Sequence, residues 1–147
     1  MSNAAEGLEV GGQRPEGAKQ TPSPALPRGF AAVDSPADFR DSGALVVRMP
    51  CGIRSKEKLL AILADKLRFP GYFGWNWDAL EECLRDLSWL PARQGVVIVH
   101  EDLPFGDGVN RSLYFSLLRN VLAHWSSDRS RSVRIVLPSG VEIPRTD

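Results

Sequence analysis

One short segment, residues 95–100, limits the folds available to this chain more than any other. Its sequence is Gly-Val-Val-Ile-Val-His, a nearly continuous apolar run that is rich in β-branched residues. A strand with one solvated face alternates polar and apolar side chains, whereas a strand in the centre of a parallel sheet is buried on both faces and is apolar throughout. We therefore predict a central parallel strand at residues 95–100.

Two further runs predict strands on either side of it along the chain. Residues 44–49 and 133–137 are short and rich in β-branched side chains, and a proline follows each of them. Arg48 and Arg134 interrupt the two runs. We interpret both as edge strands that are partly open to water.

Helical patterns separate the three strands. Residues 55–67 and 110–125 carry apolar side chains at i, i+3 and i+4, and another helix follows residue 76. Ser55 and Asn76 are predicted N-caps, because their side chains can accept hydrogen bonds from the first free amides of a helix. The order strand, two helices, strand, helix, strand predicts an α/β fold with a parallel sheet of order 1-2-3. Right-handed connections place both crossovers on one face of this sheet.

The first thirty residues differ in composition from the rest of the chain. They are rich in Pro, Gly and Ser and have no apolar period, so they cannot bury enough surface to offset their chain entropy. We predict that residues 1–30 are disordered and that residues 31–147 form one domain. The sequence has no apolar run long enough for a membrane span, and residues 1–12 lack a signal-peptide pattern. A cytoplasmic location is expected.

Charge and cysteine content exclude several classes of protein. The chain has 18 basic and 18 acidic side chains and a net charge of zero, so charge alone does not make it a nucleic-acid binder. Its two cysteines, Cys51 and Cys83, are too few for a disulfide scaffold or a four-ligand zinc site. We expect both thiols to be reduced and partly buried.

Residues 69–87 hold the densest group of aromatic and acidic side chains in the chain. An aromatic loop with Gly and Pro leads into a helix with two distinct surfaces. The predicted core stripe consists of Trp77, Leu80, Cys83, Leu84 and Leu87. Asp78, Glu82 and Asp86 form a separate acidic strip at i, i+4 and i+8.

The acidic strip does not help an isolated helix. Asp78 is favourable in the first turn, but like charges at i, i+4 cost a few tenths of a kcal/mol, and Asp86 near the C-terminus opposes the helix dipole. Glu81 and Arg85 are spaced as an ordinary exposed pair. An acidic strip beside aromatic side chains suits a basic, concave protein partner.

The same strip argues against direct RNA binding by this helix. Carboxylates repel phosphates, and aromatic platforms that stack on bases normally have Lys or Arg beside them. Basic residues gather elsewhere in the chain, where five arginines are spread over helix, loop and strand. They are Arg111, Arg119, Arg129, Arg131 and Arg134.

Residues 70–84 resemble the signature of the barstar family of ribonuclease inhibitors. They read Pro-Gly-Tyr-Phe-Gly-Trp-Asn-Trp-Asp-Ala-Leu-Glu-Glu-Cys-Leu. The family pattern runs Pro-x-Tyr-aromatic-Gly-x-Asn-x-Asp-Ala-Leu, followed by an acidic residue and often Cys-Leu. The predicted elements of residues 44–137 agree with the family's order. The resemblance implies a two-layer α/β fold with a three-stranded parallel sheet packed against helices.

The resemblance also implies a function. Family members are cytoplasmic inhibitors that protect the host from a secreted, basic ribonuclease of the microbial guanyl-specific type. Their loop and second helix plug the nuclease active site, and carboxylates take the positions of phosphates. A 1:1 complex with the nuclease and a free monomer are expected. The predicted partner-binding residues are Tyr72, Gly74, Trp75, Asn76, Asp78, Glu81 and Glu82.

Four positions depart from the family pattern. Glu81 stands where the type member has Trp, Asn120 where the family has Glu, and Glu82 where the family has Asp. Trp75 stands where an acidic residue is common. These changes leave the partner open, so the alternative is a module of the same fold that binds another basic protein without inhibiting a nuclease.

An enzyme is the third hypothesis. The run His100-Glu101-Asp102 follows a predicted strand, where active sites of α/β proteins often lie. No second motif accompanies it. We interpret His100 as a strand-end residue bonded to backbone and His124 as a favourable cation near a helix C-terminus. We expect no catalytic activity, and no metal or cofactor, because the two histidines have no ligand spacing.

Overall fold

The computed structural model describes residues 26, 28–106 and 108–144. The 3-10 helix η1 is the shortest element in this part of the chain. In chain order the elements are β3 (Phe30–Val33), η1 (Pro36–Asp38), β4 (Ala44–Met49), α1 (Lys56–Lys66), α2 (Trp77–Asp86), β5 (Gly95–His100), α3 (Val109–Ser127) and β6 (Val133–Pro138).

The strands form one parallel sheet in the order β3-β6-β5-β4. The predicted neighbours of the central strand are confirmed, since β5 lies between β4 and β6. Two predictions are wrong. The described sheet has four strands and not three, because β3 pairs with β6. Consequently β6 is an inner strand, and Arg134 does not mark an edge.

The fourth strand has a weak sequence signal. β3 spans four residues, Phe-Ala-Ala-Val, and the alanines have little strand preference. Its pairing with a distant partner makes it a strand, since Phe30 lies opposite Ile135 and Val33 opposite Pro138. The predicted disorder of residues 1–30 concerns residues that mostly lie outside the described part. Within that part, Leu26 packs against the core and β3 begins at Phe30.

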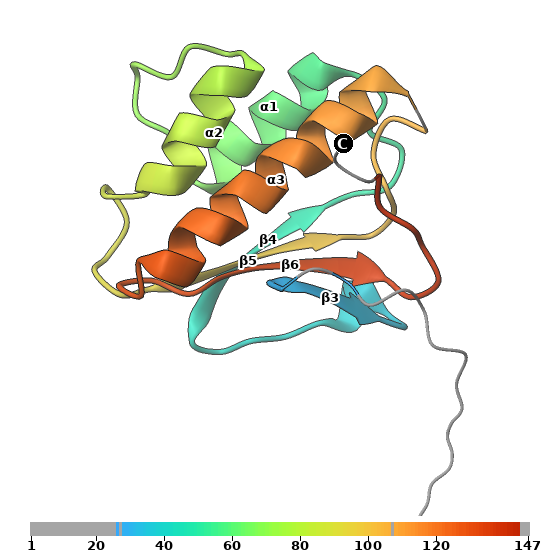
Figure 1. Ribbon diagram of the computed structural model, residues 1–147, viewed down its shortest axis with the longest axis horizontal. Helices are drawn as coiled ribbons and strands as arrows, with labels where there is room; N and C mark the ends of the chain where they lie inside the picture. The colour runs from blue at the N-terminus through green and yellow to red at the C-terminus, as the bar shows by residue number, and fades with distance from the viewer. Residues whose placement is uncertain (1–25, 27, 107, 145–147) are drawn as a thin grey trace, which may run out of the picture.

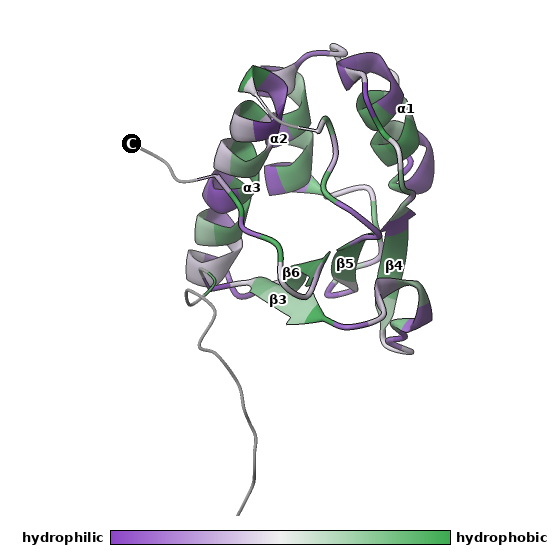
Figure 2. Cartoon of the chain, turned by 90° about the vertical axis from the view of Figure 1, so that its right-hand side faces the viewer, coloured by the Kyte–Doolittle hydropathy of each residue, from purple (hydrophilic) through white to green (hydrophobic). Residues whose placement is uncertain are grey.

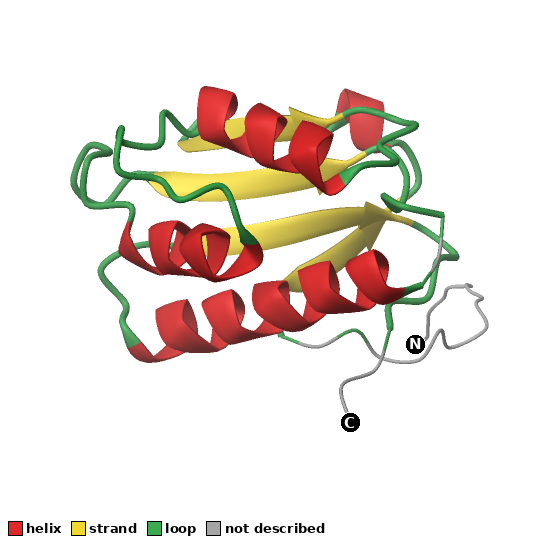
Figure 3. Cartoon of the chain, turned by 90° about the horizontal axis from the view of Figure 1, so that it is seen from above, coloured by secondary structure: helices red, strands yellow, loops and turns green. Residues whose placement is uncertain are grey.

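The three α-helices cover one face of the sheet, as predicted for right-handed crossovers (Figure 1). The connection from β3 to β4 joins the two outermost strands and therefore crosses the other face, where η1 contacts β5 and β6. In Figure 3 the sheet lies behind the helix layer, with α3 running along its β6 side.

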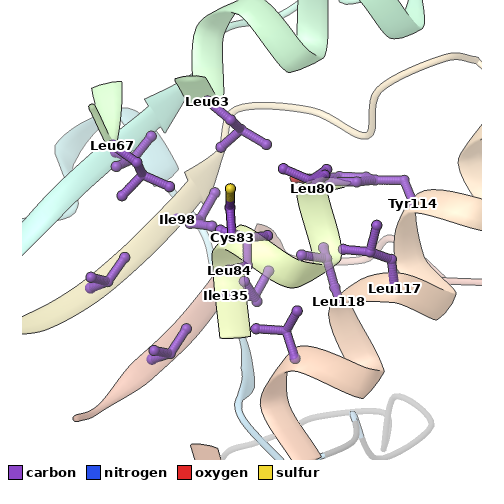
Figure 4. Close-up of a cluster of buried hydrophobic side chains, with 14 of the residues drawn as sticks. Leu63, Leu67, Leu80, Cys83, Leu84, Ile98, Tyr114, Leu117, Leu118 and Ile135 are labelled. Carbon is purple, nitrogen blue, oxygen red and sulfur yellow. The ribbon is translucent and has the colours of Figure 1, made fainter. Parts of the chain in front are cut away.

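The main core lies between the helices and the sheet. In Figure 2 the strands are mostly hydrophobic, whereas each helix has a hydrophobic and a hydrophilic side. Figure 4 shows apolar side chains from all three helices converging on β5 and β6. Its labelled residues are Leu63, Leu67, Leu80, Cys83, Leu84, Ile98, Tyr114, Leu117, Leu118 and Ile135. A smaller cluster on the opposite face contains Val97, Val99 and Val136.

Both predicted helix caps are present. The Ser55 hydroxyl oxygen accepts a hydrogen bond from the Lys58 amide at 3.1 Å, and the Asn76 side-chain oxygen accepts one from the Ala79 amide at 2.7 Å. Each bond satisfies an amide in the first helical turn. Asn76 thereby sets where the aromatic loop ends and α2 begins.

Candidate partner-binding surface

The loop before α2 has one buried aromatic ring and two aromatic rings exposed to solvent. Phe73 is 5% exposed and packs edge-on against Phe69, with ring centroids 4.8 Å apart. The side chains on either side of it along the chain, Tyr72 and Trp75, are 71% and 55% exposed. Trp75 has a left-handed backbone (φ 57°), and its ring lies 4.9 Å from that of Phe73. One buried ring thus anchors a loop that presents two others to solvent.

Gly74 and Asn76 shape this loop. A Cβ on Gly74 would lie 3.4 Å from the Ala79 Cβ and 3.6 Å from the Asn76 amide nitrogen. That amide nitrogen donates to the Gly74 carbonyl at 3.3 Å, while the Asn76 oxygen caps α2. Both residues are exposed, and their side-chain and backbone contacts bend the chain into α2.

The acidic strip of α2 faces solvent beside the loop. Asp78 and Glu82 are exposed, and neither carboxylate has a hydrogen bond or ion pair with any residue in the described part of the chain. Asp86 accepts a hydrogen bond from the Tyr72 hydroxyl at 3.4 Å. Partial desolvation, and then the charge of Asp86, raise the pKa of Tyr72, so its hydroxyl remains a donor at neutral pH.

A groove of about 520 Å³ separates the loop from α2. Tyr72 and Phe73 line one side, and Glu82 and Asp86 line the other. Cys83 also reaches it; burial, and then Asp86 and Glu82, raise the pKa of this thiol and keep it protonated. The groove therefore offers aromatic surface next to carboxylates, without a reactive thiolate.

Glu81 takes a different position from its acidic neighbours. Its carboxylate accepts from Arg85 at 3.3 Å and from the Asn120 side-chain amide at 3.4 Å. Its side chain is 26% exposed and leans toward α3 rather than toward the strip. The contact with Asn120 was not predicted from the sequence, because it depends on how α2 and α3 pack.

Two basic groups also reach this surface, which the sequence reasoning did not place there. Arg85 and His124 both line the groove beside Tyr72. Arg85 is half exposed and bonded to Glu81, and His124 lies in the last turn of α3. The surface is therefore acidic along Asp78 and Glu82, and its side toward α3 carries the basic side chains Arg85 and His124.

A comparison with protein families identifies the chain. The model of the family described as Barstar (barnase inhibitor) matches residues 46–138, well over half of the sequence. The chain belongs to the barstar family. The matched range contains the whole loop and α2, whereas β3 and η1 precede it. Among curated proteins, none matches this chain.

Membership of the barstar family gives the surface its context. The family is one of ribonuclease inhibitors and not of enzymes, and it implies a ribonuclease partner in general terms. Two of the positions that depart from the family pattern, Glu81 and Asn120, contact each other in this chain. These two departures therefore concern one contact between α2 and α3 and not two separate sites.

The barstar-family chain buries the histidine that raised the enzyme hypothesis. His100 has no exposed surface; its Nε2 lies 2.7 Å from the Tyr114 hydroxyl and its Nδ1 3.3 Å from the Val136 carbonyl oxygen. Only a protonated Nδ1 can bond to a carbonyl, so Nε2 accepts from Tyr114. Burial lowers the pKa of His100 to about 4. The predicted backbone bond is confirmed, and no substrate can reach this ring.

Most of the five arginines between Arg111 and Arg134 bond to backbone carbonyls or to a carboxylate of the same chain. Arg111 donates to the carbonyls of Pro104 and Leu103 at 3.0 and 3.3 Å, and Arg134 pairs with Asp41. Arg119 donates to the carbonyl of Pro144. Because these arginines are bonded within the fold, they do not form a free basic patch for a partner.

Arg131 has the most extensive of these contacts. It is 8% exposed, and its guanidinium donates to the carbonyls of Leu87, Pro91 and Gln94 at 3.1, 3.2 and 2.7 Å. Leu87 ends α2 in a left-handed conformation (φ 53°), which leaves carbonyls at this helix end without helical partners. Arg131 thus caps α2 and holds the acidic helix in place.

The two cysteines differ in exposure. Both cysteines are free, and Cys83 is buried, but Cys51 is exposed, so the prediction that it is partly buried is wrong. Within residues 26, 28–106 and 108–144, no three His, Cys, Asp or Glu side chains gather as a metal site. No helix in this part has the length and apolar character needed to cross a bilayer.

Proposed function

We propose that this barstar-family chain inhibits a basic ribonuclease of the microbial guanyl-specific type by covering its active site. The observation that carries the proposal is the pair Asp78 and Glu82, which are exposed and without a partner in the described chain, beside the exposed rings of Tyr72 and Trp75. A fold leaves two like charges unpaired on one helix face at a local cost. A basic partner would supply the missing counter-charges.

The proposed chemistry is phosphate mimicry. The two carboxylates are four residues apart, so they lie about 6 Å from each other along the helix axis and point the same way. An RNA-cleaving site binds phosphates with Arg, Lys and His side chains, and charge-assisted hydrogen bonds to carboxylates use the same donors. Tyr72 and Trp75 would cover the rim of the site and exclude water.

The remaining residues of the predicted surface would act around this centre. Asn76 would hold the loop in the shape that presents the aromatic rings, through its bonds to the Gly74 carbonyl and the Ala79 amide. Glu81 would contribute at the edge through its bonds to Arg85 and Asn120. We further propose a 1:1 complex, a free monomer and a cytoplasmic location, as fits a chain that protects its host from a secreted nuclease.

Inhibition of RNA cleavage tests the proposal. The full chain is mixed with guanyl-specific ribonucleases, including any encoded by the same host, and cleavage is followed against inhibitor concentration. We expect inhibition that is complete at one equivalent and weakens as salt rises, because the contacts are electrostatic. Glu82→Gln should weaken it, while Glu57→Gln, an exposed change on α1, should not. Undiminished cleavage by all of these enzymes would refute inhibition of this class.

The second candidate is a barstar-fold module that binds another basic protein without inhibiting a nuclease. The Glu81–Asn120 contact favours it, because both positions differ from the family pattern. Affinity capture with the wild-type chain and with Glu82→Gln separates the two. A recovered partner that is not a nuclease and is lost with Glu82→Gln supports the second candidate, whereas a nuclease supports the first.

A further inference from the structure

A second cavity lies beside the end of α3. It has a volume of about 280 Å³ and shares no lining residue with the groove beside Tyr72. Its walls come from the last turns of α3, from the start of β6 and from the residues just before β3. Three arginines, Arg28, Arg129 and Arg131, line it, and no carboxylate does. The proposed inhibition has no use for this cavity.

The Arg131 charge is buried in its wall without a carboxylate partner. Arg131 has only carbonyl dipoles as acceptors, and no acidic side chain of the described residues pairs with it. Its Nε is buried and makes no hydrogen bond within the described chain. The Trp125 ring lies 5.9 Å from the guanidinium carbon. A buried cation without an anion is costly, so an anion nearby is strongly favoured.

The other lining groups are suitable donors for such an anion. Arg28 and Arg129 are exposed, and neither has an ion pair with a described carboxylate. Each guanidinium presents a planar fork of N–H groups that matches the oxygens of a phosphate. Ser126 and Ser132 also line the cavity, and each has a side-chain hydroxyl that can donate a hydrogen bond.

We propose that this cavity binds a phosphate dianion, either free or as the ester of a small molecule. Arg28, Arg129 and the two serine hydroxyls donate to the phosphate oxygens, and Arg131 supplies positive charge behind them. Three cations favour a dianion over a single carboxylate. The volume is at the lower end of ligand pockets, so the phosphate carries at most a small group.

Calorimetric titration of the full chain tests this proposal. Inorganic phosphate and ribose 5-phosphate are titrated separately at constant ionic strength, and we expect saturable 1:1 binding of at least one. The ratio of the two affinities tells whether free phosphate or its ester is the preferred ligand. Absence of saturable binding by both would overturn the proposal.

Matched variants locate the binding. Arg129→Gln and Arg28→Gln should each lower the affinity about tenfold, the value of one charge-assisted hydrogen bond. Lys58→Gln removes the same charge from the exposed side of α1, where no residue lines the cavity, and should leave binding unchanged. Equal losses of affinity in all three variants would show general charge attraction. No loss in either arginine variant would show that phosphate binds elsewhere. Either result would contradict the site. Because all three side chains are exposed, these variants should fold.

Discussion

The acidic strip of α2 and three arginines that contact the fold, Arg111, Arg131 and Arg134, use charge in opposite ways. Asp78 and Glu82 project into solvent without a partner in the described chain. Arg111 and Arg131 donate to backbone carbonyls, and Arg134 pairs with Asp41. The equal totals of basic and acidic residues hide this difference. The charge available to a partner is the charge that the fold leaves unpaired, and on the α2 face it is negative.

The largest expected effect comes from neutralising the unpaired charges. The double variant Asp78→Asn with Glu82→Gln should lower affinity for the target nuclease on the order of a thousandfold, because each carboxylate loses charge-assisted hydrogen bonds. Its unfolding midpoint in urea should not fall. Loss of both affinity and stability would show that the strip supports the fold, and the contrast with the arginines would disappear.

Removing the Arg131 side chain should lower the stability of the fold, which the change to the acidic strip leaves intact. Arg131→Leu leaves the carbonyls of Leu87, Pro91 and Gln94 without their donor, and should destabilise the chain by about 3 kcal/mol. Urea unfolding followed by circular dichroism measures this. The exposed neighbour change Arg129→Gln is the control and should alter stability by less than about 0.5 kcal/mol. Equal effects of the two changes would mean that the carbonyl contacts do not hold α2.

Acid should destabilise the fold through the buried ring of His100. The pKa of His100 is lowered from 6.5 to about 4 in the folded chain, so the unfolded chain binds the extra proton first as pH falls. The stability that the neutral ring contributes is complete above about pH 6.5 and is lost toward pH 4, by about 3 kcal/mol.

Unfolding free energies of the wild type and of His100→Gln, measured between pH 7 and pH 4, check this expectation. The variant has no titrating ring at this position, so its stability should depend less steeply on pH. His124→Gln, a change at the half-buried histidine in the last turn of α3, is the matched control. Identical pH slopes for the wild type and His100→Gln would contradict the role of burial.

The smallest effect tests the local cost of the strip. Glu82→Gln alone removes repulsion with Asp78 and Asp86 along α2, and should stabilise the chain by a few tenths of a kcal/mol while it weakens binding. Thermal unfolding in low salt, where surface repulsion is least screened, measures the gain. A destabilised variant would indicate that Glu82 has a favourable role within the fold.

The sequence by itself determined the elements that depend on local patterns. The apolar run of residues 95–100 predicted a central parallel strand, and Ser55 and Asn76 predicted the starts of two helices. The core stripe of α2 was also predictable: Leu80 and Leu84 are buried there. Helical period, strand composition and caps act over a few residues, so they can be read without knowing the fold.

Only the tertiary structure decided which distant groups meet. β3 is a strand because it pairs with β6, which lies about a hundred residues later in the sequence. Glu81 turned out to bond to Asn120, and Arg131 to carbonyls around the end of α2. Long polar side chains have many rotamers and take whichever acceptors the packing brings near, whereas a short apolar period has only one face to bury. The sequence therefore revealed the acidic strip, and the fold decided which of its charges remain free.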